Sequence, residues 1–172
     1  MKKKKHSKLS VFCVVLIIFA FALGIILDIF AGDSNIEKVT VSVGQTFSLG
    51  EVEMKVNKVY FSDYMLEDLG RAGNGYRWVV VNATVHNPTS HKLTTSVERA
   101  WSTSVVYDSE YSYNSTFQNY REFLATMKEL IPLGSTTGIY TFKVPAEVER
   151  SNKPLSFVVE NGSKRVTVEI RK

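Results

Sequence analysis

The hydrophobic residues of this chain fall into one long run near the N-terminus and a series of short alternating runs after it. The long run covers residues 9–30, and 16 of its 22 positions are Leu, Ile, Val or Phe. A helix of that length spans about 33 Å, which is enough to cross the hydrocarbon core of a bilayer. Its one acidic residue, Asp28, lies near an end, where a charge costs less than at the centre. The pattern predicts a transmembrane helix.

A cleaved signal peptide is the alternative interpretation of the same run. Such a peptide has a shorter apolar core that ends at small residues, and Ala20-Phe21-Ala22 has that form. The apolar run continues for eight residues beyond it, which favours a retained anchor. Five lysines among the first eight residues predict that the N-terminus is cytoplasmic and the rest of the chain extracellular. The expected organisation is a basic head (residues 1–8), a membrane anchor (9–30), a linker (31–40) and one extracellular domain (41–172).

Period-two alternation dominates the predicted domain. Val52, Met54 and Val56 share one face of a predicted strand, but the next apolar positions, Val59 and Phe61, have the opposite parity. A β-bulge near residues 57–58 would explain the change, because one extra residue reverses the faces of a strand.

The strongest strand pattern covers residues 76–85. Its alternate positions are Val or Ala, and Trp78 and Val80 on the other face indicate a strand covered on both sides. The Asn87-Pro88 pair ends it, since proline cannot donate to the ladder. Further strands are expected over residues 45–49, 93–97, 100–107 and 138–144, a loop over residues 63–75, and a loop over residues 111–123 with a short helical turn near residues 120–127.

A C-terminal hairpin is predicted around Asn161-Gly162, a pair favoured in two-residue type I′ turns. In that register Phe157 lies opposite Val166, and Leu155 lies opposite Val168. The apolar residues of both strands then share one face.

These segments together predict an all-β fold, an immunoglobulin-like antiparallel β-sandwich of about seven to nine strands after one transmembrane helix. The only cysteine, Cys13, lies in the apolar run, so the domain has no internal disulfide. The net charge of +4 comes from the lysine-rich head, and the remaining 16 basic and 17 acidic residues nearly balance. This balance argues against a nucleic-acid partner.

Several motifs resemble the telokin-like immunoglobulin-fold domains of bacterial membrane-anchored proteins and lipoproteins. The motifs are Val43-Gly44-Gln45-Thr46-Phe47, the strand and asparagine turn over residues 78–87, Ile131-Pro132-Leu133-Gly134, and Gly138-x-Tyr140-x-Phe142-x-Val144-Pro145. The likeness covers residues 41–171. That family is largely of unknown function, so the resemblance implies a fold and a location and carries over no catalytic residue. The chain departs from it by having a plain apolar anchor instead of a lipidated cysteine.

Candidate chemistry is sparse. His86 and His91 flank the Asn87-Pro88 turn, and a metal site there would need a third ligand such as Glu98. Two solvated histidines are the favoured interpretation, because no ligand-spacing motif accompanies them. The acidic segment of Asp63, Glu67 and Asp68 lacks the pattern of a calcium loop and is interpreted as solvated surface. No metal or cofactor is therefore predicted.

Aromatic residues concentrate in a segment with weak strand character. The candidate interaction residues are Tyr107, Tyr111, Tyr113 and Tyr120, near Trp101 and Phe117. Aromatic side chains on the loops of a rigid sandwich often form binding surfaces, although they also cover core edges.

Two functions follow from these observations. The first is a membrane-anchored, non-catalytic binding module whose partner is a protein or an envelope polymer. The second is a hydrolase that acts on envelope material through an unrecognised pair of carboxylates. The lack of a catalytic motif favours the first.

Overall fold

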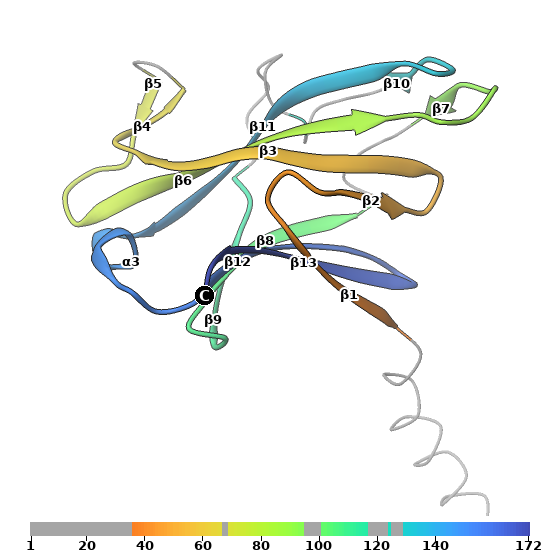
Figure 1. Ribbon diagram of the computed structural model, residues 1–172. Coiled ribbons are helices and arrows are strands. Elements are labelled where there is room, and N and C mark those ends of the chain that lie inside the picture. Colours follow the sequence, from red (N-terminus) through yellow and green to blue (C-terminus); the bar gives the residue numbers. More distant parts are fainter. Residues whose placement is uncertain (1–35, 67–68, 95–100, 117–123, 125–128) are drawn as a thin grey trace, which may run out of the picture. The chain divides into compact units, whose positions relative to one another are not determined.

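The computed structural model describes residues 36–66, 69–94, 101–116, 124 and 129–172, which form two main sheets and two short ladders (Figure 1). The five-stranded sheet contains, in spatial order, β1 (Glu37–Ser42), β13 (Lys164–Arg171), β12 (Leu155–Asn161), β8 (Ser102–Tyr107) and β9 (Tyr111–Asn114). The four-stranded sheet contains β11 (Ser135–Pro145), β6 (Tyr76–His86), β3 (Val52–Ser62) and β2 (Thr46–Leu49). The ladders pair β10 (Glu129–Leu130) with β7 (Leu93–Thr94) and β4 (Tyr64–Leu66) with β5 (Leu69–Arg71), and a short helix, α3 (Ala146–Arg150), follows β11.

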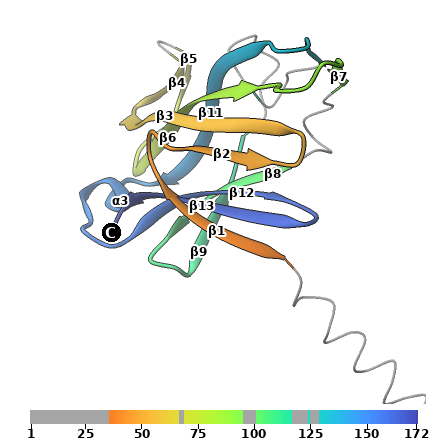
Figure 2. The same cartoon turned by 45° about the vertical axis from the view of Figure 1, so that its right-hand side comes forward.

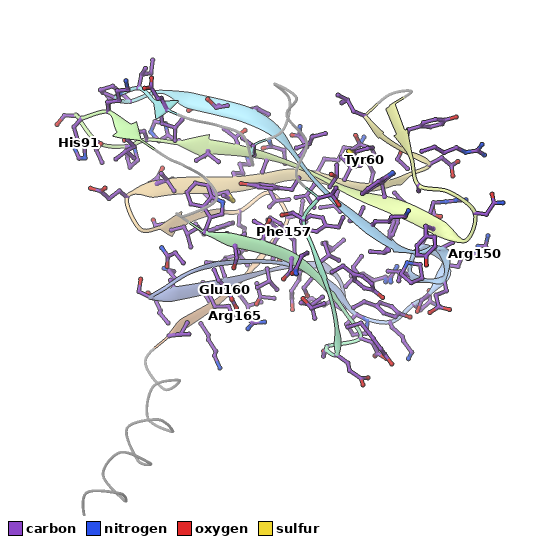
Figure 3. The ribbon with its side chains drawn as sticks, turned by 180° about the vertical axis from the view of Figure 1, so that it is seen from behind. Tyr60, His91, Arg150, Phe157, Glu160 and Arg165 are labelled. Atoms are coloured by element: carbon purple, nitrogen blue, oxygen red, sulfur yellow. The ribbon has the colours of Figure 1, made fainter. Side chains whose placement is uncertain are left out.

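The two main sheets pack face to face around one apolar core, which is the predicted all-β sandwich (Figures 1 and 2). Phe157 of β12 lies at its centre (Figure 3). Its ring centroid is 5.6 Å from that of Tyr140 and 5.8 Å from that of Phe142, both on the facing strand β11. Tilted and edge-on aromatic pairs at these separations add to the energy of burial, so this cluster joins the two sheets.

Strand alternation in the four-stranded sheet follows the predicted pattern. Val52, Met54 and Val56 are all buried, and the register of β3 against β6 shifts between Val56 and Lys58. The predicted bulge is therefore confirmed. Strand β6 is central, since β3 pairs along one edge and β11 along the other.

The outer face of β6 is covered by a hairpin that the sequence pattern did not predict. The expected loop over residues 63–75 contains strands β4 and β5 instead, and Met65 and Ala72 from this segment pack with Trp78. The indole Nε1 of Trp78 donates to the carbonyl of Gly70 at 2.6 Å. Gly70 has φ 62°, and a Cβ there would lie 3.2 Å from the Cβ of Met65. Glycine thus allows the left-handed backbone of β5 and its close approach to Met65.

The C-terminal hairpin forms with a register two residues away from the predicted one. Phe157 pairs with Val168 and Val159 with Val166, and Gly162 is not among the residues with positive φ, so the turn is not type I′. The Oδ1 of Asn161 instead accepts hydrogen bonds from the backbone N–H groups of Ser163 and Lys164 at 3.4 and 2.9 Å. A shift of two residues keeps every side chain on its predicted face, which is why the apolar pattern alone could not detect it.

Strand β1 corrects two further predictions. It begins at Glu37, so the expected linker over residues 31–40 overlaps a strand, whose Val39 and Val41 pack against the core. It also runs parallel to β13, whereas an entirely antiparallel sandwich was predicted.

Other predicted boundaries changed as well. The strand expected over residues 93–97 is described only as the short β7, and β9 occupies residues predicted as a loop. The predicted helical turn near residues 120–127 lies outside the described residues apart from Leu124, and so do the predicted head and anchor. In the part of the chain that the structure describes, no helix has the length and apolar character needed to span a bilayer.

Candidate functional site

The hairpin formed by β8 and β9 brings three of the four predicted interaction tyrosines together. Tyr107 ends β8 and pairs directly with Tyr111, while Tyr113 pairs with Val105. The rings of Tyr107 and Tyr111 lie 6.2 Å apart between centroids at an interplanar angle of 34°. The fourth residue, Tyr120, lies outside the described residues.

The three tyrosines differ in how much of the side chain is exposed to solvent. Tyr107 is only 8% exposed, and its hydroxyl donates to the Oγ of Ser151 at 2.8 Å. Tyr113 is half-buried against the core, whereas Tyr111 is 49% exposed. Tyr107 therefore covers the edge of the core, and Tyr111 supplies most of the aromatic surface open to solvent.

Trp101, predicted to accompany the tyrosines, is a core residue. It is buried, and its Nε1 donates to the hydroxyl of Tyr140 at 3.0 Å. This bond satisfies the one polar atom of the indole and the buried phenol together. Phe117 lies outside the described residues.

The turn between β8 and β9 has an unusual backbone. Asp108 and Ser109 have φ values of 55° and 59°, in the left-handed region that non-glycine residues rarely adopt. Each such residue costs roughly 1 kcal/mol, and less for aspartate than for most others. The backbone N–H of Asp108 donates to the carbonyl of Pro154 at 2.9 Å, and its carboxylate binds Lys153. These contacts hold Tyr111 directly after a strained, fixed turn.

Charged groups surround the tyrosines. Burial raises the pKa of Tyr113, and the carboxylate of Glu147 on α3 raises it further. The hydrogen bond to Asp108 raises the pKa of Lys153. At neutral pH the site therefore carries the protonated phenol of Tyr113 and the charged ammonium of Lys153. This combination is suited to binding a ligand through stacking and hydrogen bonds.

The sequence pattern did not indicate three further residues of this site, Asp108, Glu147 and Lys153. The Asp108-Ser109 pair between Tyr107 and Tyr111 does indicate a turn, because aspartate and serine both favour turns. Glu147 and Lys153 are distant in sequence from the tyrosines, and only the packing of α3 and the segment after it brings them near.

The two candidate histidines contact other groups of the described residues. His86 Nδ1 lies 3.1 Å from the carbonyl of Gly134 and 3.0 Å from Ser135 Oγ, and His91 Nε2 lies 3.5 Å from Glu51. Within the described residues no group of three or more potential ligand side chains is found. Glu98 lies outside the described residues.

Asp63, the one described residue of the acidic segment, belongs to an ion-pair network. Asp63 lies 2.7 Å from Arg77, which also contacts Glu149 at 3.0 Å. All three side chains are at least partly exposed, as expected for a surface ion pair. Glu67 and Asp68 lie outside the described residues.

The sequence over residues 41–162 matches a family described as a domain of unknown function, DUF4352. The chain belongs to the DUF4352 family. The match covers most of the sandwich, including the β8–β9 hairpin, and the family description indicates no catalytic class. No curated protein matches the sequence significantly.

Solved structures similar to this DUF4352 domain have the same fold. An uncharacterised β-sandwich protein of Clostridium difficile is 15% identical, with a TM-score of 0.61 over 81% of this chain and 98% of that one. MPT63, a secreted protein of Mycobacterium tuberculosis, is 16% identical, with a TM-score of 0.55 over 77% and 97%. A candidate lipoprotein of Bacillus subtilis, YcdA, is 16% identical, with a TM-score of 0.52 over 73% of this chain and 38% of that one. At these identities the likeness establishes the β-sandwich fold alone.

Proposed function

We propose that this DUF4352 chain is a non-catalytic binding module displayed outside the cell, and that it recognises its partner through the β8–β9 hairpin. The proposal depends on the exposure of Tyr111. This side chain is 49% exposed on the edge strand β9, which follows the strained Asp108-Ser109 turn. Backbone strain at a surface turn persists only where surrounding contacts maintain it, and such positions cluster at functional sites. Covering the exposed part of one tyrosine ring would contribute roughly 2 kcal/mol to binding.

The cellular location is part of the same proposal. The apolar run over residues 9–30 would hold the domain at the membrane as a single-pass anchor, with the lysine-rich head in the cytoplasm. The secreted and candidate lipoprotein structures of the same fold support an extracytoplasmic site for the domain. The assignment of the sandwich to the immunoglobulin-like, telokin-like class also belongs to this proposal.

A partner of this hairpin is a protein or an envelope polymer, because both bind to exposed aromatic residues flanked by hydrogen-bond donors. The test is surface crosslinking of the full-length chain in its native membrane, followed by identification of the co-purifying material. We expect capture to be lost in Tyr111→Ser. Tyr60→Ser is the matched control, since Tyr60 is 40% exposed on β3 of the other sheet (Figure 3).

Two results would contradict this assignment. Equal capture by Tyr111→Ser and the unchanged chain would remove the hairpin as the binding site. Turnover of an envelope substrate that disappears in Asp63→Asn or Glu149→Gln would favour the hydrolase instead, because Arg77 brings these two carboxylates together. Their exposure and shared arginine are more typical of a structural ion pair than of two catalytic carboxylates.

A further inference from the structure

The most exposed large hydrophobic side chains among the described residues lie far from the tyrosine hairpin. Ile131 and Leu133 are 67% and 70% exposed, whereas the other exposed large hydrophobic residues range from 36% to 49%. Both belong to the segment between β10 and β11, with the exposed Pro132 between them. We call Ile131, Pro132 and Leu133 the apolar tip.

The apolar tip is held in place by buried polar contacts. The side chain of Asn87 is fully buried, and its Nδ2 donates to the carbonyl of Ile131 at 3.1 Å. The backbone N–H of Leu133 donates to the carbonyl of Thr89 at 3.3 Å, and that of Gly134 to Ile131 at 3.0 Å. Leu133 itself has φ 56°. The exposure of these side chains is therefore imposed by a fixed backbone.

The apolar tip lies at the same end of the domain as Glu37, where β1 begins (Figures 1 and 2). Side-chain contacts lie at this end in both sheets. Glu37 pairs with Lys164 at 3.0 Å, beside the turn between β12 and β13. On the facing sheet, Glu51 lies 3.5 Å from His91, which belongs to the same loop as Thr89. Figure 3 shows His91 at this end and Arg150 at the opposite one.

The distance along the chain links this end to the proposed anchor. Six residues, 31–36, separate the apolar run from Glu37, and fully extended they span about 20 Å at most. An anchor over residues 9–30 would therefore keep the end of the domain that begins at Glu37 near the bilayer surface. An apolar segment at a membrane interface buries its side chains among headgroups and the first acyl carbons.

We propose that the apolar tip inserts into the outer leaflet of the membrane that holds the anchor, and so docks the domain against the lipid surface. This inference rests on the anchor in the proposed function. Docking would fix the orientation of the sandwich and direct the end that carries Arg150 away from the bilayer. Two aliphatic side chains are exposed here with no aromatic or charged residue between them. Binding to a lipid surface would explain this, because it requires exposed apolar area and no directional contacts.

The test uses the full-length chain in vesicles of phosphatidylcholine and phosphatidylglycerol. Cys13→Ser removes the only native thiol, and a single cysteine at Leu133→Cys then carries an environment-sensitive fluorophore. Arg150→Cys is the matched control, because Arg150 is exposed at the opposite end. We expect nitroxide-labelled lipids to quench the probe at position 133 and to leave the probe at position 150 unchanged. Ile131→Cys is a second variant, which covers the case in which Leu133→Cys disturbs the turn.

The outcomes separate this inference from the proposed anchor. A chain that washes off the vesicles in alkaline carbonate has no anchor, and both proposals would then be wrong. A chain that stays with the vesicles while the probes at 131 and 133 are no more quenched than the one at 150 retains its anchor and overturns the docking. Shielding of the probe at 133 only when a second protein is bound would assign the tip to that protein and would also overturn lipid insertion.

Discussion

Asn87 offers the sharpest test of how one buried polar side chain organises an end of this sandwich. It follows β6 directly and is fully buried. Its Nδ2 lies 2.8, 3.2 and 3.1 Å from the carbonyl oxygens of His91, Leu130 and Ile131. Its Oδ1 accepts from the backbone N–H and the hydroxyl of Thr89 at 2.9 and 2.7 Å. Asn87→Ala would remove all of these bonds without altering the backbone.

The expected loss follows from counting the bonds that an amide can make. Two N–H donors can form two full hydrogen bonds among the three carbonyls, and Oδ1 accepts two more. Four bonds at about 0.5–1.5 kcal/mol each give a loss of about 2–6 kcal/mol. The bonds to the carbonyls of His91 and Ile131 are partly buried, so water can replace the amide there, whereas the bond to the carbonyl of Leu130 is buried. We therefore expect a loss near 3 kcal/mol.

Equilibrium urea unfolding in detergent micelles measures this loss, with fluorescence of the buried Trp78 and Trp101 as the signal. A loss of 3 kcal/mol lowers the midpoint by roughly 1.5–2 M for a typical urea dependence. Asn82→Ala is the control on the same strand, since Asn82 is partly exposed and accepts one bond, from Asn57 at 3.0 Å. It should cost less than about 1 kcal/mol. Equal losses for the two variants would refute the assignment of the network to Asn87.

Two other substitutions test local features of the fold. Ser109→Gly should stabilise the domain by about 0.5–1 kcal/mol, because it relieves the left-handed strain at φ 59° at a smaller entropic cost. Ser112→Gly, within β9, should destabilise it, and a loss in both variants would contradict the strain argument. Burial raises the pKa of Tyr140, opposed by the hydrogen bond from Trp101, so the folded state keeps a proton that the unfolded state loses above about pH 10. The free energy of unfolding should thus fall as the pH rises beyond 10. Tyr140→Phe should be less stable at neutral pH, but urea titrations should show that it lacks this part of the fall.

The sequence by itself determined which residues line the core of the sandwich. Alternate side chains of a strand point to the same face, and one face of β3 packs on the core. This explains the burial of Val52, Met54 and Val56 and the bulge that follows them. The central position of β6 followed from apolar residues on both of its faces. These features are local, because each depends only on the spacing of residues along one strand.

Only the tertiary structure decided which partners those strands take and which candidate residues reach solvent. The Asn161 side chain set a turn different from the one its dipeptide favours, and the register moved by two residues with no change of face. Tyr107 and Tyr111 are similar in sequence context, yet Ser151 and the core bury one and leave the other exposed. Burial depends on segments distant in the chain, and residue type alone carries no information about them. The apolar tip is exposed and the neighbouring strands are buried for the same reason, since contacts with distant segments decide which apolar residues are covered.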